Sequence, residues 1–236
     1  MYTMTANYRM DKPDSISLDN ISLFRPKDPI SALTHFIGFW LSIIGMPILL
    51  VRAAVSSSGF STLELLSLAV FMLSMILLYG ASTSYHTFRL TREGNRILKK
   101  IDHMMISVLI AGSYTPVCVI VLNNGLGVKL LVAIWALAFI GILFKAFWVT
   151  CPKWVSSVIY IGMGWTAIFV IAPLFHLFSH GQFALLLSGG ILYTIGGVIY
   201  ALKYRFNDKF TEHELFHIFV LLGSLCHYLM MFSFVG

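Results

Sequence analysis

The sequence predicts an all-α protein, a bundle of seven transmembrane helices with its N-terminus in the cytoplasm and its C-terminus outside. Three observations lead to this prediction. Of the 236 residues, 58% are apolar and only 11% are charged, whereas soluble domains carry about 45–50% apolar and about 25% charged residues. Seven apolar runs are long enough to cross a bilayer, which takes about 20 residues. Basic residues gather in alternate connecting segments.

The apolar runs follow one another closely and are joined by short segments. A polar segment, residues 1–30, precedes them and is expected to form a cytoplasmic tail, while residues 31–236 form the membrane domain. Prolines inside the runs are tolerated in membrane helices, because neighbouring helices satisfy the freed backbone groups. The expected spans are residues 31–54, 62–86, 103–122, 128–147, 155–175, 183–202 and 213–235.

The positions of lysine and arginine predict the orientation. Fourteen of the 16 basic residues fall in the N-terminal tail and around the segments that follow the second, fourth and sixth spans. Only Arg52 and Lys129 fall on the opposite side. Because basic segments stay in the cytoplasm during insertion, we expect an inward N-terminus and an outward C-terminus.

Composition and charge exclude several classes of protein. So few charged residues cannot cover a water-facing surface, which excludes a soluble globular fold. Cys118, Cys151 and Cys226 form no C-x-x-C pair, so neither a disulfide framework nor a thiolate zinc cluster is predicted. The net charge of +6 is distributed between the apolar runs rather than gathered in one patch. We therefore expect membrane lipids, and no nucleic acid, as partners.

Several ionisable side chains fall at one depth of the predicted bundle. Each such group inside a membrane costs about 2.5–3.5 kcal/mol on insertion scales, so it requires a reason. Ser82 and His86 stand four residues apart at the cytoplasmic end of the second span, and this spacing places both on one helix face. Asp102 stands at the start of the third span, and His213 and His217 open the seventh, again four residues apart.

These residues predict a zinc site if the three helices meet. Three neutral imidazoles, here His86, His213 and His217, suit a tetrahedral Zn²⁺ ion whose fourth position holds water. The ion would acidify that water. Asp102 would then hold the water and act as a base, and Ser82 would orient the water or the substrate. The alternative for each histidine is an interfacial position without a metal.

The string His213-Glu214-x-x-His217 also matches the H-E-x-x-H motif, in which the glutamate acts as a general base of a metallopeptidase. Five letters recur easily, so the match is weak evidence for peptidase chemistry. On a helix, Glu214 lies about 100° from His213. It is thus able to face the metal, a neighbouring helix or the cytoplasmic water, and the last is the simplest interpretation.

Three other histidines are predicted to lie outside the ligand set. His35, at the cytoplasmic start of the first span, is expected either to pack at the interface or to support a ligand. His103 follows Asp102 in the chain but is expected to point to another side of the helix. His227 lies about 15 Å deeper than His217 along the helix axis, and is expected to make a buried hydrogen bond.

Five segments together resemble the pattern of a known family. They are Ser31-Ala32-Leu33-Thr34-His35-Phe36-Ile37-Gly38, Ser82-x-x-x-His86, Asp102, Ile110-Ala111-Gly112-Ser113-Tyr114-Thr115-Pro116 and His213-Glu214-x-x-His217-x-Phe219-Val220-x-x-Gly223-Ser224-x-x-His227. They span nearly the whole chain in the order of the family. The sequence thus closely resembles the hemolysin III family, the bacterial branch of the progestin and adipoQ receptor group, which includes the adiponectin receptors.

The resemblance implies more than the spacing does. It implies seven helices around a cavity open to the cytoplasm. It also implies a zinc ion held by His86, His213 and His217. Asp102 corresponds to the family aspartate that contacts the zinc-bound water, and Ser82 to the motif serine. Related membrane enzymes with this pattern hydrolyse the amide of ceramides. The implied function is therefore a zinc-dependent hydrolase of a lipid amide or ester in a bacterial plasma membrane.

Two alternatives stay open. One is a non-enzymatic sensor or regulator of membrane fluidity, in which zinc is a structural clasp between helices. The other is a transporter or haemolytic pore, although the ionisable groups gather at one face of the bundle instead of lining a path across it.

Overall fold

The computed structural model describes residues 26–207 and 210–235. Within these ranges the chain is helical and contains no strand. The described ranges hold seven helical segments that are long and apolar enough to cross a membrane. This confirms the predicted all-α bundle of seven spans. Most of the tail expected at residues 1–30 lies outside the described residues, and the first helix begins at Pro29.

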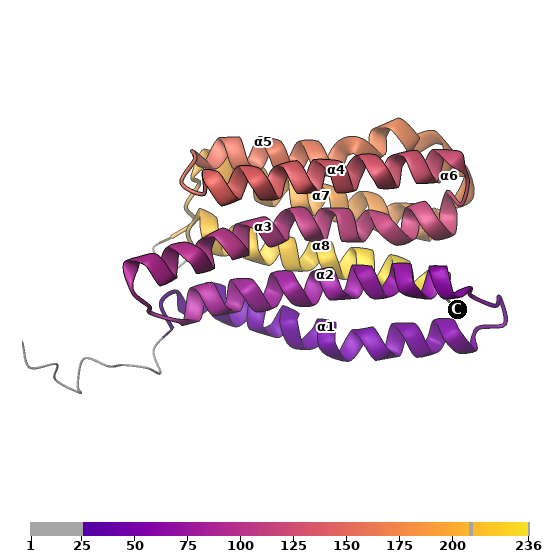
Figure 1. Cartoon of the computed structure of the whole chain (residues 1–236), viewed down its shortest axis with the longest axis horizontal. Coiled ribbons are helices and arrows are strands. Elements are labelled where there is room, and N and C mark those ends of the chain that lie inside the picture. Colours follow the sequence, from indigo (N-terminus) through magenta and orange to yellow (C-terminus); the bar gives the residue numbers. More distant parts are fainter. Residues whose placement is uncertain (1–25, 208–209, 236) are drawn as a thin grey trace, which may run out of the picture.

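The spans lie side by side along the long axis of the molecule (Figure 1). Most are single α-helices, whereas the third ends in a π-helical turn and the fifth combines three helical pieces. The elements are α1 (Pro29–Val55), α2 (Thr62–Thr87), α3 (Arg92–Pro116), the π-helix η2 (Val117–Val121), α4 (Gly125–Phe147), α5 (Lys153–Gly164), the 3₁₀-helix η3 (Trp165–Val170), α6 (Ile171–Leu177), α7 (His180–Leu202) and α8 (Glu212–Phe234).

Short polar side chains fix where several helices begin. The first backbone N–H groups of a helix lack partners within the helix, and a side-chain oxygen at the preceding residue satisfies them. Reciprocal capping boxes start three of the helices, formed by Ser61 and Glu64 in α2, Ser179 and Gln182 in α7, and Thr211 and Glu214 in α8. The box in α8 fixes the start of a helix whose first two turns carry His213 and His217.

Helix α3 begins earlier than its apolar run predicts. The run indicated a start at residue 103, but the helix starts at Arg92, where the Thr91 hydroxyl accepts a hydrogen bond from Gly94 N at 3.2 Å. The first turns project beyond the neighbouring helices (Figure 1). Asp102 therefore lies well inside the helix and not in its first turn. Hydropathy marks only the apolar part of a helix, so it missed this polar extension.

The fifth span changes helix type at its middle, where α5 ends at Gly164. Tyr114 of α3 satisfies the backbone groups that this break frees. Its hydroxyl donates a hydrogen bond to Gly164 O at 2.5 Å and accepts one from Ala167 N at 2.8 Å. Backbone groups at membrane depth must be satisfied within the protein, so this side chain allows the irregular segment to exist there.

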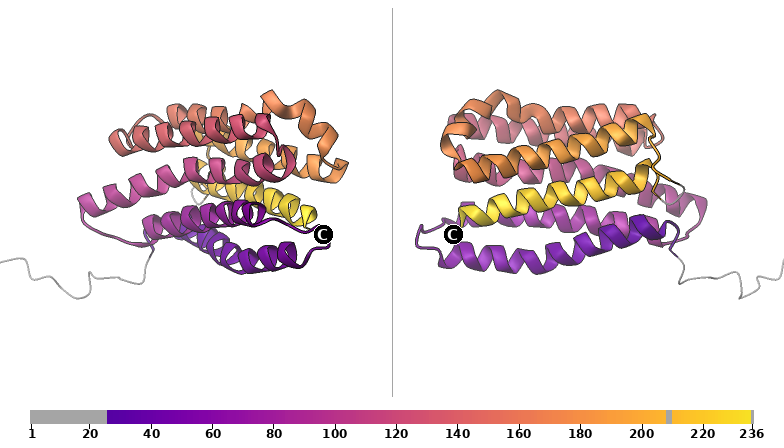
Figure 2. Two further views of the ribbon diagram at one scale, coloured as in Figure 1. Left: turned by 45° about the vertical axis from the view of Figure 1, so that its right-hand side comes forward. Right: turned by 180° about the vertical axis from the view of Figure 1, so that it is seen from behind.

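The helices close into a ring. Each packs against the next from α1 to α4, α5 packs against α4 and α7, and α8 packs against both α7 and α1. Seen from behind, α7 and α8 lie next to each other (Figure 2). The ring surrounds a cavity of about 460 Å³ with mostly apolar walls, which is within the usual range for small-molecule sites.

Gly127 provides a test of the close packing between α4 and η2. A Cβ atom at this position would collide with the backbone carbonyl oxygen of Cys118 and lie 3.0 Å from Leu122 Cβ. We expect Gly127→Ala to lower the free energy of unfolding by about 1–3 kcal/mol, the usual range for overpacking. The measurement is unfolding of the purified protein in detergent.

Gly162→Ala is the matched control. Gly162 also lies inside a helix, but no atom lies within 4 Å of a Cβ built there. Alanine favours the helix over glycine by up to about 1 kcal/mol, so this variant should be neutral or more stable. Equal destabilisation by the two substitutions would contradict the packing described here.

Candidate metal centre

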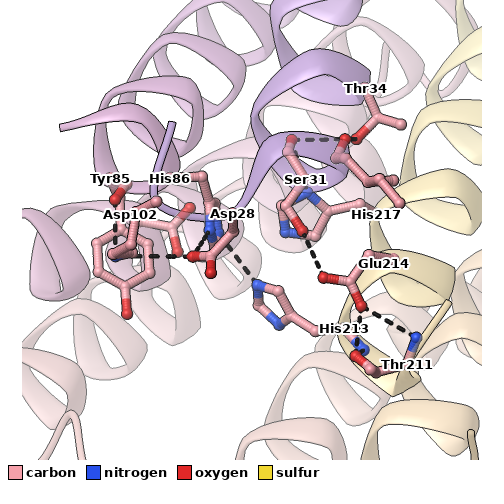
Figure 3. A network of polar contacts seen from close by, with 12 residues as sticks. Asp28, Ser31, Thr34, Tyr85, His86, Asp102, Thr211, His213, Glu214 and His217 are labelled. Carbon is pink, nitrogen blue, oxygen red and sulfur yellow. Dashed lines mark hydrogen bonds and ion pairs between the residues drawn. The ribbon is translucent and has the colours of Figure 1, made fainter. Parts of the chain in front are cut away.

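The structure brings together the three histidines that the sequence predicts as ligands. His86 lies in the last turn of α2, and His213 and His217 lie in the first turns of α8. One ring nitrogen from each falls within 4.8 Å of those of the other two, and the rings converge in Figure 3. The lateral proximity of α2 and α8, which the sequence left as an assumption, is therefore present.

The donor set fits a metal ion such as zinc. His86 and His217 are only 1% and 2% exposed, and His86 Nε2 lies 3.1 Å from His213 Nε2. Two nitrogens bound to one tetrahedral zinc ion, at Zn–N distances of about 2.0–2.1 Å, lie about 3.3 Å apart. The observed separation is close to this value. Three convergent imidazoles in a buried site are thus suited to hold a cation.

Hydrogen bonds on the opposite ring nitrogens orient two of these histidines. His86 Nδ1 lies 2.8 Å from Asp28 Oδ2, and His217 Nδ1 lies 3.3 Å from Ser31 O. A carboxylate and a carbonyl oxygen both accept hydrogen bonds, so each ring donates through Nδ1 and presents Nε2 to the centre. Partners of this kind fix the tautomer and the direction of metal-binding histidines.

Sequence reasoning missed Asp28. This residue directly precedes α1, and its backbone N donates a hydrogen bond to His86 O at 3.0 Å, which lays the segment across the end of α2. The hydrogen bond with His86 lowers the pKa of the Asp28 carboxyl below its ordinary value, so the group is ionised at neutral pH. The sequence feature that could have identified Asp28 is a carboxylate just before the first span, at the depth of the histidines.

Asp102 of α3 and Ser82 of α2 lie beside the histidines. They are 5% and 0% exposed. The Asp102 carboxylate interacts electrostatically with His86 and with the Ser82 hydroxyl, and the Ser82 hydroxyl makes no hydrogen bond of ordinary length to a described residue. Figure 3 shows Asp102 next to His86. A buried carboxylate and a buried hydroxyl thus adjoin the three imidazoles.

Glu214 makes contacts away from the centre. Its Oε1 accepts a hydrogen bond from Ser31 Oγ at 3.2 Å, and its Oε2 accepts from Thr211 N at 3.0 Å and from the Thr211 hydroxyl. The side chain therefore closes the first turn of α8 and joins that turn to α1. These contacts favour a structural role for Glu214 over the general-base role of the H-E-x-x-H motif. The sequence had favoured a side chain that faces the cytoplasmic water, whereas Glu214 contacts Ser31 and Thr211.

Two of the other histidines lie closer to the centre than the sequence suggested. His35 stacks on His217 with ring centroids 3.7 Å apart, so it packs inside the bundle and supports a candidate ligand. His103 was expected to point away from Asp102, but its Nδ1 lies 3.0 Å from Asp102 Oδ2. His227 makes the expected buried hydrogen bond, with Nε2 3.4 Å from a carbonyl oxygen of α7.

The cavity of the bundle reaches this centre. His213, His217 and Asp102 line it at the end where α8 begins, whereas Leu174 and Phe183 line it near the opposite end, where α6 ends and α7 begins. An elongated apolar molecule inside the cavity would therefore have one end at the histidines.

Fold and site together define a multi-pass membrane protein with a candidate metal centre buried at one end of its helical bundle. Comparison with known proteins identifies the family. The model of the family described as Haemolysin-III related matches residues 24–228, and the chain belongs to this family. The resemblance predicted from the motifs is thus confirmed.

The relatives cover most of the chain. It is 41% identical to "Hemolysin-3 homolog" of Bacillus subtilis (strain 168) over 205 residues, which is 86% of this chain and 92% of that protein. It is 38% identical to "Hemolysin-3" of Bacillus cereus over 220 residues, 92% of this chain and 96% of that protein. It is also 23% identical over 223 residues to "Adiponectin receptor protein" of Drosophila melanogaster, which covers 83% of this chain and 48% of that protein.

The hydrogen bond between Asp28 and His86 predicts an effect on metal affinity. Asp28→Asn keeps the size of the side chain but removes the charged acceptor that orients His86. We expect it to weaken zinc binding about 10–100-fold, the usual effect of losing such a partner. The measurement is competition with a chromophoric chelator, using protein purified in detergent.

Two further variants serve as the negative and the positive control for this measurement of zinc affinity. His217→Ala removes one of the three nitrogen donors and should abolish stoichiometric binding. Glu93→Gln, at an exposed carboxylate in the first turn of α3, should bind zinc like the unmodified protein. If Asp28→Asn also bound zinc with unchanged affinity, the carboxylate would have no part in holding the ligand.

Proposed function

We propose that this protein is a zinc-dependent hydrolase that cleaves an amide or ester bond of a lipid. The proposal rests chiefly on three histidines, two of them buried and one partly buried, that converge beside Asp102 at one end of a mostly apolar cavity. Structural zinc sites are closed by four protein ligands, whereas catalytic sites have three and keep one position open. The group suited to hold a metal among the described residues has three members, which favours the catalytic kind.

Each residue of the centre has a role in this proposal. Zinc bound by the histidines would polarise the substrate carbonyl and acidify a water molecule. Asp102 would hold that water and accept its proton, and the Ser82 hydroxyl would orient the water or the substrate by a hydrogen bond. The apolar walls of the cavity would accept the acyl chain and exclude bulk water from the reacting bond.

The test is hydrolysis by the purified, zinc-loaded protein. We expect release of fatty acid from a member of a panel of long-chain acyl amides and esters, measured by mass spectrometry. Removing zinc with a chelator should abolish the release, and adding zinc back should restore it. His217→Ala should reduce the rate to background, and Asp102→Asn should lower kcat by about 10²–10⁴-fold, the usual contribution of a general base.

Glu93→Gln serves as the control for these variants, and its rate should be unchanged. Stoichiometric zinc without turnover of any substrate in the panel would contradict the hydrolase. That result would favour the regulator of membrane state, in which the same three histidines clasp α2 to α8.

We further propose that the histidine end of the bundle faces the cytoplasm of a bacterial cell, with the N-terminus inside and the C-terminus outside, in the plasma membrane. The distribution of basic residues supports this orientation. The bacterial origin of two relatives supports the location.

The orientation predicts which loops a membrane-impermeant maleimide reaches. In a background without Cys118, Cys151 and Cys226, a cysteine at the exposed position Ser57, between α1 and α2, should be labelled in intact bacterial cells. A cysteine at the exposed position Arg89, between α2 and α3, should react only after lysis. The reverse labelling pattern would invert the proposed orientation.

A further inference from the structure

We infer that His103 is a further catalytic residue: the general acid that protonates the leaving nitrogen when an amide is cleaved. The inference rests on the proposed hydrolase function and adds to it, because it assigns the proton needed for amide cleavage to a residue outside the three-histidine group.

The position of His103 supports this role. The residue follows Asp102 in α3, is 7% exposed, and lines the same cavity as His213 and His217. Asp102, which precedes it in the chain, lies next to His86 in Figure 3. The histidine thus adjoins the candidate metal centre without belonging to it.

Hydrogen bonds hold the ring in one orientation. His103 Nδ1 lies 3.0 Å from Asp102 Oδ2, so Nδ1–H donates a hydrogen bond to the carboxylate, and Nε2 is the ring nitrogen left to meet a ligand in the cavity. The Tyr160 hydroxyl donates a hydrogen bond to His103 O at 2.7 Å, which ties this turn of α3 to α5. A carboxylate that orients a histidine through Nδ1 is the arrangement used by catalytic triads.

Four other cavity-lining groups near the centre are less suited to the task. His213 and His217 are the candidate metal ligands, and His35 is stacked face to face on His217. The Tyr160 hydroxyl is committed to the backbone of α3. His103 lies next to Asp102, and its second ring nitrogen is in a position to donate a proton to the substrate.

The reaction adds one water molecule across the C–N bond of the amide. Water adds to the carbonyl carbon and gives one proton to Asp102. The C–N bond then breaks, its electron pair stays on nitrogen, and protonated His103 donates its Nε2 proton to that nitrogen. The products are a carboxylic acid and an amine. Asp102 then releases the water-derived proton to solvent and His103 Nε2 takes up a proton from solvent, which restores both groups.

The experiment compares two substrates with the same acyl chain, an alkyl amide and a nitrophenyl ester. Nitrophenolate leaves without a proton, so a general acid accelerates only the amide reaction. We expect His103→Gln to lower kcat/KM for the amide by about 10²–10⁴-fold and to leave the ester reaction nearly unchanged. Asp102→Asn should slow both reactions, because both need the attacking water.

Controls separate catalysis from folding and metal loss. His103→Gln should keep its zinc content and thermal stability, and Glu93→Gln, at an exposed position in the first turn of α3, should keep the amide-to-ester ratio of the unmodified protein. Mass spectrometry should find His103 modified by diethyl pyrocarbonate in the unmodified protein, and a long-chain fatty acid in the cavity should protect it.

Three outcomes would overturn the inference. If His103→Gln slowed both reactions equally, or neither, His103 would not be the general acid, while the hydrolase function would stand. If the zinc-loaded unmodified protein cleaved neither substrate, nor any other in the lipid panel, the hydrolase function would fall and the inference with it.

Discussion

The convergence of three imidazole nitrogens inside a membrane bundle is the interaction on which the rest of the site depends. Polar side chains at this depth are expensive unless they meet partners within the protein. His86, His213 and His217 meet one another, and Asp28 and Ser31 accept hydrogen bonds from the far sides of two of the rings. This requires the end of α2, the start of α8 and the segment before α1 to be held together. The closed ring of helices provides that constraint.

The cavity gives the centre its chemical setting. Its walls are mostly apolar along the bundle, and its polar groups near the centre include Asp102 and His103 from α3 as well as two of the three histidines. The break in the fifth span contributes to the same cavity, since Gly164 and Ala167 line it and the Tyr114 hydroxyl satisfies their backbone groups. A cavity with polar groups at one end and apolar walls elsewhere suits a molecule that has one polar reactive group and a long apolar chain.

Sequence reasoning was sufficient to locate the spans and to predict that the site residues lie at one depth of the bundle. Apolar runs of membrane length located the seven membrane-length helical segments of the described residues, and the four-residue spacing of His213 and His217 placed both on one face of α8. It was less accurate where polar residues extend a helix. Helix α3 starts at Arg92 and not near residue 103, because its first turns are helical without being apolar.

The sequence by itself determined the number of spans, their class and the residues that share a depth, because hydropathy and helical periodicity are properties of each segment alone. Only the tertiary structure decided which helices are neighbours, and hence that His86 of α2 meets His213 and His217 of α8. It also showed that Asp28 forms a hydrogen bond with His86 and that His103 forms one with Asp102. These contacts join different helices, or depend on how side chains rotate toward the cavity, and neither property is encoded in the periodicity of one segment.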